Sequence, residues 1–226
     1  MKHVMKHVTL SALFIFFISA GLSYGTVVGS KHDFSISGTS GFHSDNETEV
    51  CIFCHTPHNA SAVPLWNRTL DSVGYTPYSS PTLNANGGTL SAPTGISLLC
   101  MSCHDGVSAI NVLVNYGTVN PIIMNQNRTK LGDLSYPPST NPNLTKDLSN
   151  DHPVSFTYDT TLANNDGGLH DPGANGANIT PLKLYGSKLE CATCHDPHEE
   201  GTLTGTAPFL RMSNSSSGMC LKCHNK

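Results

Sequence analysis

Apolar residues in this chain fall in short, separated groups, apart from one continuous run near the N-terminus. The first 25 residues read MKHVMKHVTLSALFIFFISAGLSYG, with Lys2 and Lys6 before the run and the small residues Ser23 and Gly25 after it. This order is typical of a secretory signal peptide. The run is shorter than the ~20 apolar residues that cross a membrane. We therefore expect residues 1–25 to be removed and the remaining chain to be exported and soluble, with no membrane span.

Beyond residue 25 the apolar pattern predicts few regular elements. Residues 97–106 (SLLCMSCHDG) and 216–224 (SSGMCLKCH) are typical of short helices, and Gly106 ends the first of them. Residues 108–116 (SAINVLVNY) and 153–158 (PVSFTY) alternate and carry β-branched side chains, which predicts isolated strands. The fold class predicted is mostly coil with short helices and few strands.

Composition explains why so little regular structure is expected. Only 12% of the residues are charged, whereas ~25% is usual, and Asn, Ser, Thr, Gly and Pro take up the difference. Such a chain buries too little apolar surface to offset its ordering entropy. Something other than side chains is therefore expected in its interior. The net charge of -4 provides no basic surface, which argues against nucleic acid as a partner.

The eight cysteines indicate what fills that interior. They form four C-x-x-C pairs, and a histidine directly follows each pair. C-x-x-C-H is the attachment signature of c-type haem, in which two thiols bind the vinyl groups and the histidine binds the iron. Zinc ribbons and disulfides are the alternatives, but neither requires a histidine after every pair. The motifs are CIFCH (Cys51, Cys54, His55), CMSCH (Cys100, Cys103, His104), CATCH (Cys191, Cys194, His195) and CLKCH (Cys220, Cys223, His224).

Two of the motifs carry a second histidine three residues after the first. His58 follows His55 in CHTPH, and His198 follows His195 in CHDPH. Three residues span at most ~11 Å, and the proline between them fixes its own φ. The second histidine therefore cannot reach the opposite face of the same haem. We predict that it binds the iron of a different haem nearby.

The chain repeats this plan, which predicts two dihaem modules. In residues 26–131 a histidine precedes CIFCHTPH, then VPLWNR, then CMSCH; in residues 151–226 a histidine precedes CATCHDPH, then APFLR, then CLKCH. Residues 132–150, rich in Pro, Ser and Asn, are predicted to link the modules. The repeat selects four distal iron ligands from six spare histidines and leaves His43 and His170 without counterparts. The four are His32, His58, His152 and His198.

Other side chains have two interpretations each. Arg68 and Arg211 are expected either to pair with haem propionates or to be exposed. The apolar residues after the first motif of each module are expected to pack on haem faces or to form a small core of their own; they are Leu65, Trp66, Phe209 and Leu210. Three methionines are expected to pack against porphyrin edges rather than to bind iron; they are Met124, Met212 and Met219.

Several segments together resemble the OmcE-like family of extracellular tetrahaem c-type cytochromes of metal-reducing bacteria. They are SKHDFS, CIFCHTPHNA, PLWNR, LLCMSCHDG, DHPVSF, LECATCHDPHEE and PFLRMSNS with CLKCHNK, and they cover most of the chain after residue 25. The resemblance implies four covalently attached haems with bis-histidine ligation, in a coil wrapped around a haem chain. It also implies polymerisation into an extracellular nanowire, with a histidine of one subunit binding a haem of the next, and electron exchange with other redox cytochromes.

The expected function is therefore electron transfer without catalysis. A soluble periplasmic shuttle is the alternative with the same chemistry, and a multihaem oxidoreductase with one open haem is a further one. For the ligand shared between subunits we favour His32, since it lies near the new N-terminus on a polar segment that can extend. His152 is the second choice and His43 the third. His58 and His198 are disfavoured because their motifs hold them beside their own haems.

Overall fold

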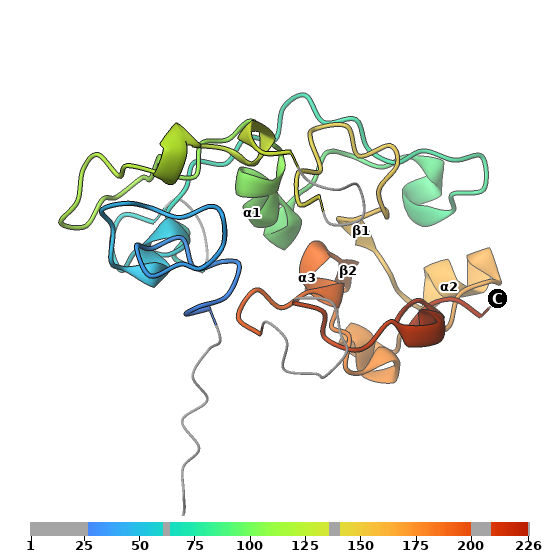
Figure 1. Cartoon of the computed structure of the whole chain (residues 1–226). Helices are drawn as coiled ribbons and strands as arrows, with labels where there is room; N and C mark the ends of the chain where they lie inside the picture. Colours follow the sequence, from blue (N-terminus) through green and yellow to red (C-terminus); the bar gives the residue numbers. More distant parts are fainter. Residues whose placement is uncertain (1–26, 61–63, 136–140, 200–208, 226) are drawn as a thin grey trace, which may run out of the picture.

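The structure is a computed structural model that describes residues 27–60, 64–135, 141–199 and 209–225 (Figure 1). The predicted signal peptide lies outside these residues. The described backbone is mostly turns and irregular segments, as predicted, with helices α1 (Gly95–His104), α2 (Thr160–Asp166) and α3 (Cys191–Cys194). The described helices are too short and too polar to cross a bilayer.

Strands β1 (Phe156–Thr157) and β2 (Lys188–Leu189) form one antiparallel pair, in which Phe156 lies opposite Leu189. The remaining elements are 3-10 helices: η1 (Val50–Phe53), η2 (Ala85–Gly88), η3 (Asn125–Asn127), η4 (Leu131–Asp133), η6 (Ala174–Ile179), η7 (Ser215–Ser217) and η8 (Cys220–Lys222).

The helix predicted at 97–106 is confirmed as α1. Its C-cap is Asp105, and Gly106 follows with a φ of +74° in the left-handed region that favours glycine. A Cβ at Gly106 would collide with the side chain of Asn143. The helix predicted at 216–224 is reduced to the separate turns η7 and η8.

One strand prediction holds in part and the other is wrong. Residues 153–158 contain β1, and its partner β2 was not predicted. Residues 108–116 form no strand, because distant residues occupy their backbone groups. The amide of Val114 donates to the carbonyl of Asn67 (2.8 Å), and the carbonyl of Ile110 accepts from Arg68 (2.7 Å). Because these backbone groups are already hydrogen-bonded, the segment cannot pair with a neighbouring strand.

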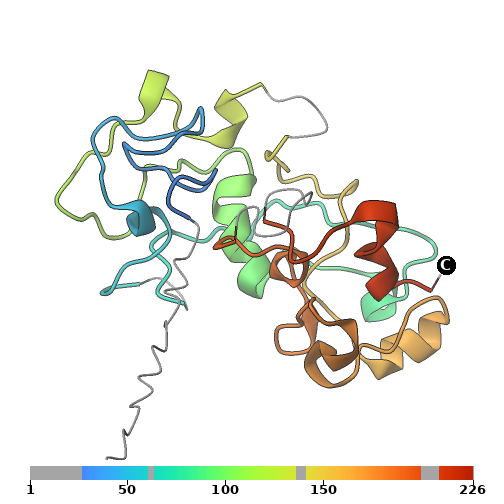
Figure 2. The same ribbon diagram turned by 60° about the horizontal axis from the view of Figure 1, so that its bottom comes forward.

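Two clusters of buried apolar side chains lie toward opposite ends of the molecule, with α1 and α3 between their segments (Figures 1 and 2). The first cluster consists of Phe34, Phe42, Ile52, Phe53, Ile110, Leu113, Ile122, Met124 and Leu131. The second consists of Ala85, Leu90, Phe156, Tyr158, Leu162, Ala163, Ile179, Leu182, Leu184, Leu189 and Cys223. Ala85 and Leu90 come from the first predicted module, so a segment of that module packs into the core formed mostly by the second.

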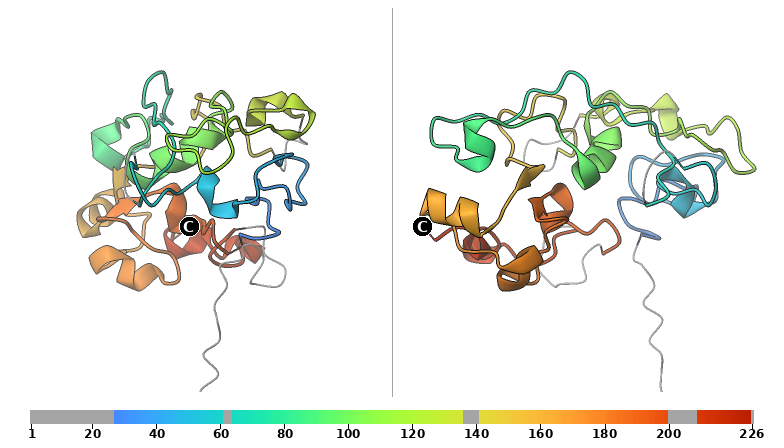
Figure 3. Two further views of the ribbon diagram at one scale, coloured as in Figure 1. Left: turned by 90° about the vertical axis from the view of Figure 1, so that its left-hand side faces the viewer. Right: turned by 180° about the vertical axis from the view of Figure 1, so that it is seen from behind.

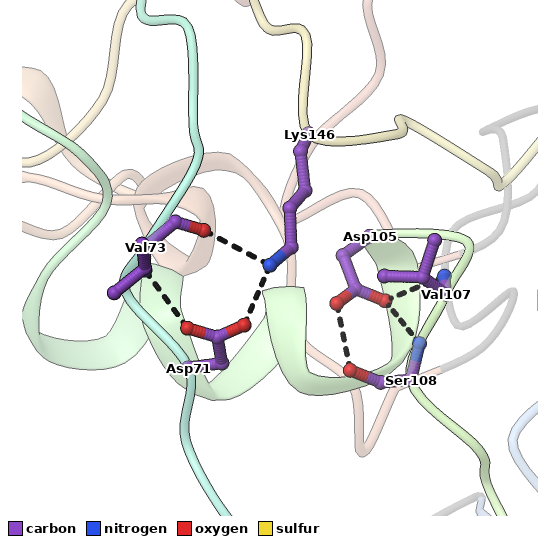
Figure 4. A network of polar contacts seen from close by, with 6 residues as sticks. All are labelled: Asp71, Val73, Asp105, Val107, Ser108 and Lys146. Atoms are coloured by element: carbon purple, nitrogen blue, oxygen red, sulfur yellow. Dashed lines mark hydrogen bonds and ion pairs between the residues drawn. The ribbon is translucent and has the colours of Figure 1, made fainter.

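The described part of the predicted linker lies against the first module. Lys146 donates to the carboxylate of Asp71 (2.6 Å) and to the carbonyl of Val73 (2.9 Å), as Figure 4 shows. The amide of Leu144 donates to the carbonyl of His104 (2.9 Å). In the same view Asp105 accepts from the amides of residues 107 and 108 and fixes the turn after α1. The segment therefore supports the residues around His104.

Candidate haem sites

Each C-x-x-C-H motif folds as one helical turn. In the motifs of His55, His195 and His224 the amide of the histidine donates to the carbonyl of the first cysteine (2.8, 3.1 and 2.9 Å). The motif of His104 forms the C-terminal end of α1. This turn places two thiols and one imidazole on neighbouring positions. We number the sites along the chain: site 1 (Cys51, Cys54, His55), site 2 (Cys100, Cys103, His104), site 3 (Cys191, Cys194, His195) and site 4 (Cys220, Cys223, His224).

The thiols form neither a disulfide nor part of a converged metal-ion site among the described residues. All eight cysteines are unpaired, so no disulfide joins them. Among the described residues no three His, Cys, Asp or Glu side chains converge as a metal-ion site requires, whereas structural zinc needs four ligands. Burial raises the pKa of Cys54 to about 12 and that of Cys194 to about 11, with a smaller contribution from neighbouring thiols.

Three of the four motif histidines have a ring close to that of a spare histidine of the same chain. Two imidazoles that bind one iron from opposite faces each hold a nitrogen about 2 Å from the metal, so their centroids lie about 6 Å apart. The interplanar angles are 14° for the pair at site 1 and 74° for the other two. Binding of one iron from both faces fixes the distance between the two ring centroids but allows any angle between the ring planes. The pairs are His55 with His198 (6.2 Å), His104 with His32 (6.1 Å) and His224 with His152 (6.4 Å).

Carbonyl oxygens orient several of these rings through Nδ1, which leaves Nε2 for a metal. Ligating histidines commonly show this arrangement. The Nδ1 atom lies 2.8 Å from Pro64 O in His55, 2.7 Å from Pro142 O in His104 and 2.9 Å from Pro153 O in His152. In His198 the Nδ1 atom lies 3.5 Å from a carboxylate oxygen of Asp196. These second partners were not predicted from the sequence, although each is a proline carbonyl or lies inside the C-H-x-P-H motif.

The surroundings of His32 differ from those expected of a ligand that extends to another subunit. Its ring stacks on Phe209 (4.2 Å between centroids, 16°) and lies beside His104. Burial, followed by the proximity of His104, lowers the pKa of His32 to about 4. The imidazole is therefore neutral at neutral pH, as metal ligation requires. In the structure His32 thus lies beside the motif histidine of site 2 in its own chain, and its role between subunits stays a prediction.

The remaining histidines form no such pair. The ring of His195 has no second imidazole at this spacing among the described residues, which include every histidine from His32 to His224. His58 is exposed on a loop. His43 is half-buried with its Nδ1 atom 3.0 Å from Ser40 O, and His170 is exposed. Of the predicted ligands, His58 and His195 therefore belong to none of the three ring pairs.

The expectation that the two arginines are exposed is wrong, and their pairing with haem propionates stays a prediction. Arg68 is 2% exposed, and its guanidinium donates to the carbonyls of Ser102 (2.7 Å), Ile110 (2.7 Å) and Ala109 (2.8 Å). Arg211 donates to Ala192 O (2.8 Å), to Asp196 (2.9 Å) and to the Tyr185 hydroxyl (2.8 Å). Ser102 and Ala192 lie inside C-x-x-C turns. Each arginine thus binds the backbone of an attachment motif.

The apolar residues near the motifs have several roles. Trp66 donates through Nε1 to Ser102 Oγ (3.2 Å) and places its ring edge-on to His55. Leu65 is 53% exposed, whereas Met124 is buried in the first cluster. Leu210 pairs with His195 in an isolated β-bridge. Met212 and Met219 pack against the second cluster.

Site 1 opens into a cavity of about 400 Å³. Cys51, Ile52, His55, Leu65 and Tyr116 line it, among others. Its wall thus offers a thiol, an imidazole and apolar surface to one ligand, which are the groups that an attached macrocycle needs. Together with the three imidazole pairs, this cavity shows that the residues present fit covalently bound haem.

Comparisons with models of known protein families and with characterised proteins found no match for this chain.

Proposed function

We propose that this chain is an exported tetrahaem c-type cytochrome that transfers electrons outside the cell and assembles into a conductive filament. The observation that carries the proposal is the pairing of His55, His104 and His224 each with one spare histidine at the spacing of axial ligands. When bound, haem supplies a one-electron redox centre at each site. The resemblance to extracellular nanowire cytochromes supports the filament and the exported location.

In this proposal the histidines of the chain bind the haem irons and thereby keep substrate away from them. At sites 1, 2 and 4 the paired imidazoles would hold a bound haem iron from both sides and would leave no position for a reacting molecule. The Pro64 and Pro142 carbonyls orient the imidazoles of His55 and His104. Rigid, saturated ligation limits rearrangement between oxidation states, which suits electron transfer. A soluble shuttle would use the same three pairs.

One observation favours an enzyme as the second candidate. His195 has no second imidazole at ligand spacing among the described residues. In an isolated chain site 3 would then keep one axial position open, as in an oxidoreductase. In a filament a neighbouring copy would fill it. Carbon monoxide binding to the intact, purified assembly separates the two, because only the enzyme retains an open iron there.

The experiment that tests the proposal is mass spectrometry of the secreted protein, followed by electron microscopy. We expect the chain after about residue 25 to carry four haem masses and no reactive thiol, and the preparation to contain filaments. A matched variant with Cys51→Ser and Cys54→Ser should carry three haem masses. Fewer than four haems in the natural chain, or bound zinc, would contradict the cytochrome. A monomer with every iron six-coordinate would contradict the filament.

A further inference from the structure

The segments that follow sites 1 and 3 take the same backbone path, which shows which residues of the two modules correspond. In each segment, the amide of the residue after the motif histidine donates to the carbonyl of a residue with a positive φ, Leu65 (+58°, 2.9 Å) or Phe209 (+63°, 2.7 Å). Two positions later the amides of Asn67 and Arg211 donate to the carbonyl of the second cysteine of their motifs (both 2.9 Å). Asn67 therefore corresponds to Arg211, and Arg68 lies one position further along.

Arg68 is consequently a positive charge that only the first module has at this position. The second module has Met212 there, a neutral side chain that packs against the second cluster. Arg68 is 2% exposed, and the carbonyls of Ser102, Ala109 and Ile110 hold its guanidinium in place. A guanidinium stays protonated even when it is buried. A fixed positive charge therefore lies inside the first module.

This charge lies close to the attachment sulfurs of two sites. Ser102 directly precedes Cys103 of site 2, and Cys54 of site 1 packs with Cys103 against the first cluster. Burial raises the pKa of both thiols, and the charge of Arg68 opposes this rise at both. Apart from burial and neighbouring thiols, Arg68 is the group that shifts the pKa of Cys54. Arg68 thus acts on site 1 and on site 2.

The residue after each motif histidine decides whether a negative charge accompanies the positive one. At site 2 it is a carboxylate, 1% exposed, that adds to the effect of burial on the pKa of the Cys103 thiol and opposes the effect of Arg68. At site 3 the carboxylate lies 2.9 Å from the guanidinium of Arg211. The four residues are Thr56 (site 1), Asp105 (site 2), Asp196 (site 3) and Asn225 (site 4). Site 1 therefore combines the buried positive charge with a neutral residue at this position, whereas carboxylates offset the arginines at sites 2 and 3.

Two further charges lie near sites 1 and 4 at positions open to water. Glu49 lines the cavity of site 1 and is exposed, and Lys222 lies inside the motif of site 4 and is partly exposed. Water and salt screen charges at the surface far more than buried charges. We therefore expect the buried charge of Arg68 to act more strongly than either.

We propose that Arg68 gives the haem of site 1 the highest reduction potential of the four, so that an electron on this chain is held preferentially at site 1. Reduction adds one electron to ferric iron, makes or breaks no bond and lowers the charge of the site by one; a one-electron donor, such as another redox cytochrome, supplies the electron. A buried positive charge stabilises this reduced form relative to the oxidised form. The inference rests on the proposed function, since the potential belongs to bound haem.

The first test compares two substitutions of Arg68 that both remove its planar fork but differ in charge. Arg68→Met, which introduces the side chain of the second module, should lower the highest of the four midpoint potentials by about 60 mV, a ~tenfold change in the ratio of ferrous to ferric iron. Arg68→Lys keeps the charge and should stay close to the natural value. Spectroelectrochemical titration of the secreted, haem-loaded protein measures the midpoints. An unchanged highest midpoint in Arg68→Met, or an equal fall in both variants, would refute the role of the charge.

The second test does not depend on replacing Arg68. Cys51→Ser combined with Cys54→Ser removes the haem of site 1, which mass spectrometry verifies, and should remove the highest midpoint. Asp105→Asn removes the negative charge at site 2, so one of the lower midpoints should rise. Lys183→Met, which removes an exposed positive charge, is the control and should leave all four midpoints unchanged.

Three results of this second test contradict the inference. The highest midpoint could survive the loss of haem from site 1, in which case the electron is held elsewhere. Unchanged midpoints in Asp105→Asn would show that no carboxylate offsets Arg68 at site 2. A fall in Lys183→Met as large as that in Arg68→Met would show that burial gives Arg68 no special effect.

The two proposals fail in different ways. A natural protein with fewer than four haems contradicts the proposed function, whatever the variants show. A natural protein with four haems whose highest midpoint belongs to another site contradicts only the role of Arg68.

Discussion

The carboxylate of Glu190 accepts a hydrogen bond from the backbone amide of Ser97 (3.2 Å), which joins the residue before site 3 to the first turn of α1. The Ser97 hydroxyl also donates to this carboxylate and accepts from the amide of Cys191 (3.0 Å). Ser155 Oγ adds a further bond (3.0 Å). Views from the side and from behind show α1 and α3 at the middle of the molecule (Figure 3). This buried network therefore sets the position of site 3 relative to site 2.

Glu190→Ala should destabilise the protein by about 2–4 kcal/mol, because it leaves the buried amide and hydroxyl of Ser97 without their acceptor. Denaturant unfolding followed by circular dichroism measures the change. Glu199→Ala, at an exposed glutamate, is the control and should change the free energy of unfolding by less than about 0.5 kcal/mol. Equal stability of the two variants would show that the network contributes nothing.

Arg68→Lys should cost about 2–4 kcal/mol, since an ammonium cannot reproduce the planar fork that serves three buried carbonyls. The side chain is 2% exposed and has no route to water. Arg128→Lys, at a guanidinium whose bond to Gly41 O is exposed, should be close to neutral. The midpoint of urea unfolding compares them, and a neutral Arg68→Lys would contradict the role given to these bonds.

His198→Ala should leave four haems attached and convert one iron per chain to the high-spin state, at site 1. The reason is that His198 is the imidazole that faces His55 at 6.2 Å. His170→Ala replaces another exposed histidine outside every pair and should leave the electron paramagnetic resonance spectrum unchanged. A wholly low-spin spectrum from His198→Ala would remove this residue from the ligand set.

The reduction potentials should lie well below those of cytochromes with His/Met ligation, because two imidazoles stabilise ferric iron more than a thioether does. Met124 is buried in the first cluster, and Met212 and Met219 pack against the second, so these methionines serve packing. A spectroelectrochemical titration measures the potentials. Midpoints at clearly positive values would indicate methionine ligation instead.

The sequence by itself determined the features that depend on neighbouring residues. A C-x-x-C-H motif closes its own turn with a bond from the histidine amide to the first cysteine, five positions in all, so its local form was predictable. Gly106 ended α1 as predicted because only glycine adopts its φ without strain. The shortage of charged and apolar residues likewise predicted a fold of turns with little regular structure.

Only the tertiary structure decided which distant groups meet. The repeat selected His32 as a ligand but could not show that its ring lies beside His104 and stacks on Phe209. Segment 108–116 has the pattern of a strand, yet Arg68 and Asn67 take its backbone groups. Both outcomes depend on contacts between residues far apart in the chain. Such contacts form only when the whole chain packs, so the local pattern of residues does not predict them.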